Sequence, residues 1–305
     1  MIRHDMRRII NIDNEAVLSL SNRQLEIKLL NNSGEYMIPI EDIMVLMISN
    51  PSSRISTGTV RVLGEENVPV VFCGNNYHPV SICLPLEGNT LVSKRIKIQV
   101  ECPEPARKQA WQQTIIAKIV NQASLVDLIG KNSKAITKYK TRVLSGDKDN
   151  AEAKAAREYW KVIFEDGFAR DRFGKWPNPA LNYTYAVYRA VMARAVVGTG
   201  LNPSLGIHHR NQYNAFCLVD DLIEPYRPFA DLVVLSLLKE DSFVEHIQSD
   251  ELTKEVRKYL LGSLNMTVKL GGKEFLLSSA MEVTADSYLN LISGKAKRIR
   301  YPEVL

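Results

Sequence analysis

The pattern of apolar residues changes near Leu86, and this change limits the folds that the chain can adopt. Before it, short segments rich in β-branched and aliphatic residues alternate with turn residues. After it, apolar residues recur at helical spacing through long segments. Strands that are followed by helices, rather than alternating with them, indicate an α+β fold. We therefore predict a small β-rich N-terminal domain over residues 1–85 and a larger α-helical domain over residues 86–305.

The N-terminal segments predict strands because they are short, β-rich and bounded by turn residues. In chain order they are RRIINI, AVLSLS, QLEIKLL, EYMIPI, IMVLMIS and VPVVFC. The last two are denser apolar runs, which favour buried strands. Between these two runs, TGTVRVLGEEN predicts a short helix.

The later segments predict helices because their apolar residues return every three or four positions. In chain order they are KQAWQQTIIAKIVNQASLVDLI, AEAKAAREYWKVIFEDGF, ALNYTYAVYRAVMARAVVGTG, PFADLVVLSLLKED and TKEVRKYLLGSL. MTVKLGGKEFLL predicts a hairpin that turns at Gly271 and Gly272, and SSAMEVTADSYLNLIS predicts a final helix. The last segment, GKAKRIRYPEVL, is basic and predicts a mobile tail.

The composition is that of an ordinary globular protein, with 45% apolar and 24% charged residues. No apolar run reaches the ~18 residues that span a bilayer, and the basic start lacks the apolar core of a signal peptide. We therefore expect a cytoplasmic protein with no membrane partner. The four cysteines form no CxxC pair, which argues for reduced thiols rather than a structural zinc site. The net charge of +5 permits a nucleic-acid partner without requiring one.

Residues 200–228 carry the densest set of chemically active groups. They include two adjacent histidines and three acids: His208, His209, Asp220, Asp221 and Glu224. Histidine nitrogen and carboxylate oxygen are ligands for a divalent metal, and a metal held in this way suits phosphoryl transfer on a nucleic acid. The structural alternatives are that the acids pair with Arg227 and that the histidines bond to backbone carbonyls.

Glu152 is a further candidate, in the Ala-rich segment AEAKAAREYW. A glutamate in the first turn of a helix is usually a solvated residue that the helix dipole favours. Ala156 and Tyr159 lie four and seven residues further on, so they share its face. Because this face is small and aromatic, it would turn Glu152 toward the core.

Three motifs taken together resemble the Cas1 family of CRISPR-associated adaptation integrases and endonucleases. They are AEAKAAREYW, NPALNYTYAVYRAVMARAVVGTGLNPSLGIHH and DDLIEPYRP. Their order and the β-rich start extend the resemblance over nearly the whole chain. The last motif, with its EP-aromatic-RP run, is similar to the form found beside Cas9-type effectors.

Carried over residue by residue, the resemblance makes Glu152, His209 and Glu224 the catalytic residues and the ligands of Mg²⁺ or Mn²⁺. His209 is selected because it ends a Gly-x-x-His turn that begins at Gly206. His208, one position earlier, stays open as an alternative ligand.

Three neighbouring positions are less defined by the resemblance. Asp221 matches an acid that supports the site in some relatives, while Asp220 has no assigned role. Relatives commonly have Glu-Gly at the first motif, where this chain has Glu152-Ala153. Alanine should be tolerated there because it favours the helix.

The resemblance implies a metal-dependent DNA endonuclease and integrase. The enzyme would join the 3′-hydroxyl ends of captured DNA fragments to repeat DNA by transesterification. It would act as a homodimer docked through the N-terminal domains. A small second CRISPR adaptation protein would be its partner, and a Cas9-type effector is a further potential partner. Two alternatives stay open. One is a metal-dependent nuclease that acts on branched or single-stranded DNA without integration, and the other is a non-catalytic DNA-binding scaffold.

Two basic clusters flank the Glu152 segment in the sequence. They are Lys131, Lys134, Lys138, Lys140 and Arg142 before it, and Arg170, Arg172 and Lys175 after it. Such clusters are by default solvated faces. With a phosphoryl-transfer site between them, we expect a groove that neutralises DNA phosphates. Tyr183, Tyr185 and Tyr188 on the next predicted helix are expected to lie in the core or its wall.

Overall fold

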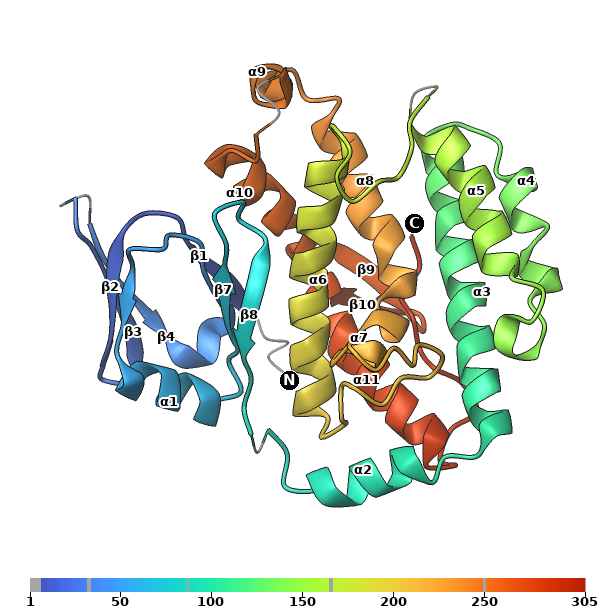
Figure 1. Cartoon of the computed structure of the whole chain (residues 1–305), viewed down its shortest axis with the longest axis horizontal. Coiled ribbons are helices and arrows are strands. Elements are labelled where there is room, and N and C mark those ends of the chain that lie inside the picture. Colours follow the sequence, from blue (N-terminus) through green and yellow to red (C-terminus); the bar gives the residue numbers. More distant parts are fainter. Residues whose placement is uncertain (1–6, 32–33, 87, 165–166, 249–250, 305) are drawn as a thin grey trace. The chain divides into compact units, whose positions relative to one another are not determined.

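The computed structural model of the chain describes residues 7–31, 34–86, 88–164, 167–248 and 251–304. The chain forms two compact units, Met1–Val92 and Ser93–Leu305, and each is described by itself. The first unit is built on strands, and the second is mainly helical (Figure 1). The predicted α+β fold is therefore confirmed.

The first unit contains two four-stranded sheets, with strand orders β1-β5-β7-β8 and β4-β3-β2-β6. The strands are β1 Arg8–Ile12, β2 Ala16–Ser21, β3 Gln24–Leu29, β4 Glu35–Pro39, β5 Ile43–Ile48, β6 Arg54–Ile55, β7 Val70–Cys73 and β8 Pro79–Cys83. Strand β5 pairs in parallel with β1 and β7, and all six of its side chains are buried. The sequence predicts every strand except β6, which has two residues, and β8, which is largely exposed. Neither of these carries an apolar pattern long enough to be recognised.

Helix α1 (Thr57–Glu65) forms where the sequence predicts a short helix. The Ser56 hydroxyl precedes it and accepts a hydrogen bond from the Thr59 amide at 3.1 Å, which is the bonding expected of an N-cap serine. Leu63 on α1 packs into the core cluster that contains Leu18 of β2. The cluster draws side chains from both sheets, so burial of apolar surface holds the unit together.

The second unit consists of helices and one short hairpin. The elements are α2 Val92–Val100, α3 Glu104–Leu128, α4 Lys134–Thr137, α5 Ala151–Ile163, α6 Asn178–Gly198, α7 Cys217–Leu222, α8 Arg227–Leu237, α9 Val244–Gln248, α10 Lys254–Gly262, β9 Thr267–Leu270, β10 Lys273–Leu276 and α11 Leu277–Ile292. The 25-residue helix α3 contacts α5, α8 and α11 (Figure 1). Buried side chains cover more than half of the circumference of α3, as expected for a helix that packs against several others.

Helix α5 begins at a bonded turn that fixes the position of Glu152. The Asn150 side chain accepts a hydrogen bond from the Ala153 amide. The Asp147 carboxylate accepts one from the Ala151 amide at 2.8 Å and one from the Glu152 amide at 3.1 Å. These bonds satisfy amides that a helix leaves open at its start. The first turn of α5, which carries Glu152, is therefore well anchored.

The basic segment after α11 is held against α3, so the prediction of a mobile tail is wrong. The Gln113 amide donates a hydrogen bond to the Lys297 carbonyl at 3.0 Å, and its oxygen accepts one from the Ile299 amide at 2.8 Å. The Asn121 oxygen accepts a hydrogen bond from the Val304 amide at 3.2 Å. Polar side chains along α3 thus satisfy backbone groups of the segment. Its basic composition alone gave no sign of these bonds.

Within the described ranges, no helix combines the length and the apolar character that crossing a membrane would need.

Candidate metal centre

A buried lysine on α3 joins two glutamates from distant parts of the chain. The Lys118 ammonium contacts Glu152 Oε1 and lies 2.5 Å from Glu224 Oε2. Glu152 comes from the first turn of α5, and Glu224 begins a short 3₁₀ turn between α7 and α8. The Lys118 and Glu224 side chains are 9% and 11% exposed, whereas that of Glu152 is 29% exposed. Glu152 therefore lies at the solvent edge of the site rather than pointing into the core.

Glu224 is ionised although it is buried. The Arg227 Nε donates a hydrogen bond to its Oε1 at 2.8 Å. Burial alone would raise the pKa of Glu224, but the charges of Arg227 and Lys118 hold it at about 2. Burial would lower the pKa of Lys118, but the charges of Glu224 and Glu152 raise it above its ordinary value. Both partners of this pair are therefore charged at neutral pH.

The second oxygen of Glu224 lies beside a cation. Its Oε2 is buried and accepts no well-aligned hydrogen bond from the described residues, although the Lys118 ammonium lies close to it. A buried carboxylate oxygen is normally satisfied by hydrogen bonds, a cation or a metal. Here an ammonium occupies the position of that cation.

Asp221 holds the turn that carries His209. Its fully buried carboxylate accepts hydrogen bonds from the amides of Ile207 at 2.5 Å, His208 at 2.9 Å and His209 at 3.3 Å. It also lies 2.5 Å from Nδ1 of the His209 ring. This contact raises the pKa of His209, with burial opposing it and the charge of Glu224 adding to it. A carboxylate on Nδ1 fixes the ring and leaves Nε2 as the nitrogen that can bind a metal.

Gly206 gives this turn the room it needs. A Cβ at Gly206 would lie 2.3 Å from the His209 carbonyl oxygen, 2.9 Å from the Cys217 Cβ and 3.0 Å from the Asp221 carboxylate. The first of these atoms belongs to the backbone and cannot move aside by rotating a side chain. The Gly-x-x-His spacing therefore has a steric cause in this chain.

We expect Gly206→Ala to destabilise the protein by roughly 1–3 kcal/mol, because the added methyl group overpacks the turn. Urea unfolding measures the change. The matched control is Gly198→Ala, since Gly198 ends α6 and a Cβ there meets open space. The control should be neutral or stabilising by up to ~1 kcal/mol. Equal losses in the two variants would contradict the steric argument.

His208 has a different environment from His209. Its ring stacks on Trp111 of α3, with centroids 4.4 Å apart and planes 4° from parallel. The His209 ring meets the same indole edge-on at 5.8 Å. Trp111 thus packs against both rings, but only His209 also has a carboxylate on its ring nitrogen.

Asp220 ties α7 to α6. It forms an ion pair with Arg189 Nε at 2.6 Å and accepts a hydrogen bond from the Asn214 amide at 2.7 Å. Its carboxylate is occupied by these partners, which gives it a structural role.

Asp231 on α8 connects α5 and α6 through two tyrosines. Tyr159 donates a hydrogen bond to its Oδ2 at 2.6 Å, and Tyr185 donates one to its Oδ1. Burial raises the pKa of Asp231 from 3.8 to about 6, although the tyrosine hydroxyls lower it in part. Arg227, the partner of Glu224, lies over the Tyr185 ring at 4.7 Å. The network therefore reaches Glu224 of the candidate metal centre through Arg227.

We expect Asp231 to make stability depend on pH. A carboxyl whose folded pKa is raised stabilises the protein below its unfolded pKa, and this contribution is lost as pH rises to about 6. A rise of this size corresponds to about 3 kcal/mol in total, of which roughly half is lost between pH 5 and pH 8. Urea unfolding should therefore show that the free energy of unfolding of the wild type falls relative to that of Asp231→Asn between pH 5 and pH 8. A difference that does not change with pH would contradict this assignment.

The structure brings two of the three predicted ligands together directly. Glu152 and Glu224 share the Lys118 ammonium, and the turn of Asp221 orients His209. Across the part of the chain that the structure describes, no three His, Cys, Asp or Glu side chains are grouped closely enough to hold a metal ion. The donor chemistry nevertheless fits Mg²⁺ or Mn²⁺, since two carboxylates and an imidazole are available and one carboxylate oxygen has no hydrogen bond. The pairing of Glu224 with Arg227, which the sequence left open, is present as well.

Lys118 is the residue that sequence reasoning missed. Trp111, Ile115 and Lys118 recur at helical spacing, so the lysine falls in the apolar stripe of the predicted helix. A lysine is almost never fully buried unless it is paired. That position in the stripe was the signal that a buried acid should be sought as its partner.

The basic clusters predicted for DNA are partly engaged within the protein. The Lys131 ammonium binds the Val162 carbonyl, Lys138 and Arg142 lie over the Tyr139 ring, and Arg170 binds Asn178 and Asn182. Tyr183 and Tyr188 are buried in α6, and Tyr185 is bonded to Asp231. The three tyrosines therefore belong to the core and its wall, as expected.

The chain is similar over most of its length to one protein-family model and to a curated protein. Residues 10–265 match the family model described as CRISPR associated protein Cas1. The CRISPR-associated endonuclease Cas1 of Neisseria meningitidis serogroup C is 34% identical over 301 residues, which cover 98% of this chain and 96% of that protein. Neisseria Cas1 is thus similar along nearly its whole length.

Two solved structures share the fold. One is a casposase bound to integration product, with a TM-score of 0.78 and 20% identity over 96% of this chain and 92% of that chain. The other is a Cas6-RT-Cas1–Cas2 complex, with a TM-score of 0.74 and 17% identity over 98% of this chain and 36% of that chain. At these identities the similarity concerns the fold alone. The family model and the Neisseria relative carry the assignment further, and this chain belongs to the Cas1 family.

Proposed function

We propose that this protein is a metal-dependent DNA integrase of CRISPR adaptation. It would join the 3′-hydroxyl ends of captured DNA fragments to repeat DNA by transesterification. The observation that carries the proposal is the meeting of Glu152 and Glu224 at one buried cation position. Two acids brought together in this way suit a divalent metal that acts on phosphodiesters.

Glu152, His209 and Glu224 would hold Mg²⁺ or Mn²⁺. When bound, the metal supplies Lewis-acid stabilisation of the charge that develops on the reacting phosphate. Glu224 is ready to bind because the charges of its partners keep it ionised at neutral pH. His209 is ready because Asp221 fixes its ring through Nδ1.

Other residues of the chain would position these groups. Arg227 holds one oxygen of Glu224 and leaves the second, which lies beside the Lys118 ammonium, for a cation. Lys118 keeps the two glutamates from repelling each other when no metal is present. Asp221 fixes the backbone of the His209 turn through three amide bonds. The attacking group is a DNA hydroxyl, so no protein nucleophile is needed.

The expected partners are DNA, a second copy of this chain, a small second CRISPR adaptation protein and, in this form, a Cas9-type effector. A homodimer docked through the N-terminal unit is supported by its exposed apolar side chains. Tyr36 and Met37 are 52% and 42% exposed on β4, which is the edge strand of its sheet. Edge strands with apolar side chains favour pairing with another chain.

The direct test is joining of a labelled 3′-hydroxyl DNA duplex to a plasmid that carries the repeat. We expect joined product with Mn²⁺ and the small partner protein present, and none with EDTA. Cleavage of branched or single-stranded DNA without joined product would favour the alternative nuclease, because the same residues would then direct water to the phosphate.

A second candidate, a non-catalytic DNA-binding scaffold, is favoured by the pairing of Glu152 and Glu224 with Lys118 and Arg227. In that case the acids would only balance buried cations. Calorimetry with Mn²⁺ separates the two, since the scaffold should bind no metal and the integrase should bind it through Glu224. The variant Glu224→Gln should then abolish the heat of binding.

A further inference from the structure

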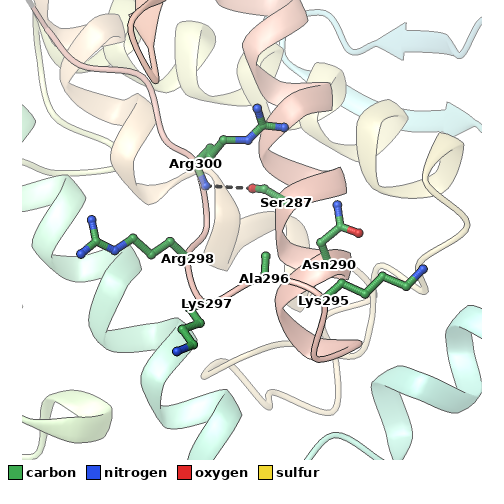
Figure 2. Close-up of a pocket in the computed structure, with 7 residues that line it drawn as sticks. All are labelled: Ser287, Asn290, Lys295, Ala296, Lys297, Arg298 and Arg300. Carbon is green, nitrogen blue, oxygen red and sulfur yellow. Dashed lines mark hydrogen bonds between the residues drawn. The ribbon is translucent and has the colours of Figure 1, made fainter.

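A basic pocket lies where α11 ends and the C-terminal segment begins. Its volume is about 600 Å³, and Figure 2 shows its lining, which includes Ser287, Asn290, Lys295, Lys297, Arg298 and Arg300. No acidic residue belongs to the lining that the structure describes. The pocket shares no residue with the candidate metal centre, so its charge needs a separate explanation.

The four cationic side chains of the pocket are unneutralised. All four are exposed, and none forms a hydrogen bond or ion pair with any residue that the structure describes. By contrast, Lys118, Arg189 and Arg227 each pair with an acid. Several like charges gathered on one short segment create a positive potential that attracts anions.

The segment that carries these charges is held in place. Gln113 of α3 binds the Lys297 carbonyl and the Ile299 amide. The Ser287 hydroxyl of α11 accepts a hydrogen bond from the Arg300 amide at 2.9 Å. A ligand would therefore meet a surface whose backbone is already ordered, which lowers the entropic cost of binding.

The end of α11 does not cancel this positive charge. The Asn290 carbonyl accepts hydrogen bonds from the Lys295 amide at 2.8 Å and the Ala296 amide at 3.1 Å. The carbonyl groups that a helix exposes at its C-terminus are thus occupied by the backbone. Compensation of the helix dipole is the structural role that cations at this end of a helix can have instead.

The arrangement of the cations indicates what kind of anion fits. In Figure 2 they surround the small Ala296, with Lys297 and Arg298 on one side and Lys295 on the other, and they do not converge on one point. A single phosphate would be held by converging donors. Cations spread along a surface suit successive phosphates of one backbone.

We propose that this pocket binds the phosphodiester backbone of DNA outside the metal centre, through at least two phosphates. The proposal rests on the proposed function in taking DNA as the substrate. It adds a binding site on the C-terminal segment, where the sequence predicted only a tail.

The test measures binding of a fluorescein-labelled DNA duplex to the full chain by anisotropy, in EDTA and over a range of salt concentrations. The variant Lys297→Ala/Arg298→Ala should bind roughly 10- to 100-fold more weakly at 0.1 M salt. The slope of log K against log salt should fall by roughly 2, since each lost phosphate contact removes about 0.9. The charge-keeping variant Lys297→Arg/Arg298→Lys should retain both affinity and slope.

The matched control is Lys254→Ala/Lys258→Ala, which removes two exposed lysines from α10 and should change the affinity by less than about threefold. Equal losses in the pocket and control variants would overturn the proposal. A lower melting temperature with unchanged DNA affinity would also overturn it, because the cations would then serve only the helix end. A third outcome would also overturn the proposal. If millimolar inorganic phosphate competes for the pocket and the pocket variant keeps the salt slope of DNA binding, the ligand is a small anion rather than DNA.

The readout in EDTA separates this proposal from the proposed function. Glu152→Gln should bind DNA as the wild type does while failing to join it. A wild type that joins DNA, with a pocket variant that binds normally, overturns the pocket alone. A wild type that never joins DNA, with a pocket variant that binds weakly, supports the pocket and overturns the integrase.

Discussion

Replacing His209 by alanine is expected to lower the rate of Mn²⁺-dependent DNA joining by roughly 10²- to 10³-fold, because it removes a proposed ligand of the charge-stabilising metal. Replacing His208 by alanine should leave most of the rate. That variant loses the stacking of the ring on Trp111 and its edge-on contact with the His209 ring, and an aromatic pair of this kind is worth about 1 kcal/mol of stability. Joining of a labelled duplex to repeat DNA measures the rate, and urea unfolding measures the stability.

The comparison tests the geometry of the turn as well as the identity of the ligand. Asp221 contacts the ring of His209 and only the backbone of His208. Circular dichroism confirms that both variants are folded, and Mn²⁺ calorimetry gives a readout that does not depend on joining. Full activity in the His209 variant refutes its role, whereas loss confined to the His208 variant moves the ligand by one residue.

Replacing Lys118 by methionine is expected to destabilise the protein by roughly 3 kcal/mol in EDTA, because it leaves two ionised glutamates without the cation between them. Glu224 keeps Arg227 as a partner, but its Oε2 and Glu152 would both lose the ammonium that they share. Mn²⁺ should restore more stability to the variant than to the wild type, since the metal and the ammonium compete for the same carboxylates. Thermal unfolding with and without Mn²⁺ measures both effects.

The matched control for this variant is Lys108→Met on the same helix. Lys108 pairs with Glu104 at 2.6 Å, and both side chains are largely exposed, at 41% and 60%. An exposed pair of this kind contributes at most about 1 kcal/mol. If Lys118→Met costs no more than Lys108→Met, or if Mn²⁺ stabilises both equally, the lysine does not hold the metal position.

Local pattern predicted most elements of this fold, but it gave no information on how distant segments bond to one another. The β-rich start, α1, the long helices and the hairpin at Gly271 and Gly272 follow from periodicity and turn residues, which act over a few positions. β8 was missed because its side chains are mostly exposed and leave no apolar pattern. The bonds that hold the C-terminal segment to α3 join residues more than 180 positions apart, and no local signal encodes such bonds.

The candidate site also has a part that the sequence predicted and a part that depends on the folded chain. Residue chemistry and family resemblance selected Glu152, His209 and Glu224. The roles of Lys118 and Asp221 depend on where buried side chains meet, which only the folded chain determines. Gly206 lies between these two cases. Its spacing from His209 can be recognised in the sequence, but the steric reason for a glycine there follows only from the structure.

Asn121 has a practical consequence for how this protein can be handled. Its fully enclosed amide donates hydrogen bonds to the Pro225 carbonyl at 2.8 Å and the Pro302 carbonyl at 3.0 Å, while its oxygen binds the Val304 amide. Pro225 follows Glu224 directly, so one side chain fastens both the turn of Glu224 and the last described residues. An affinity tag or fluorescent fusion that draws Val304 away from α3 would loosen the support beneath Glu224, and such additions belong elsewhere on the chain.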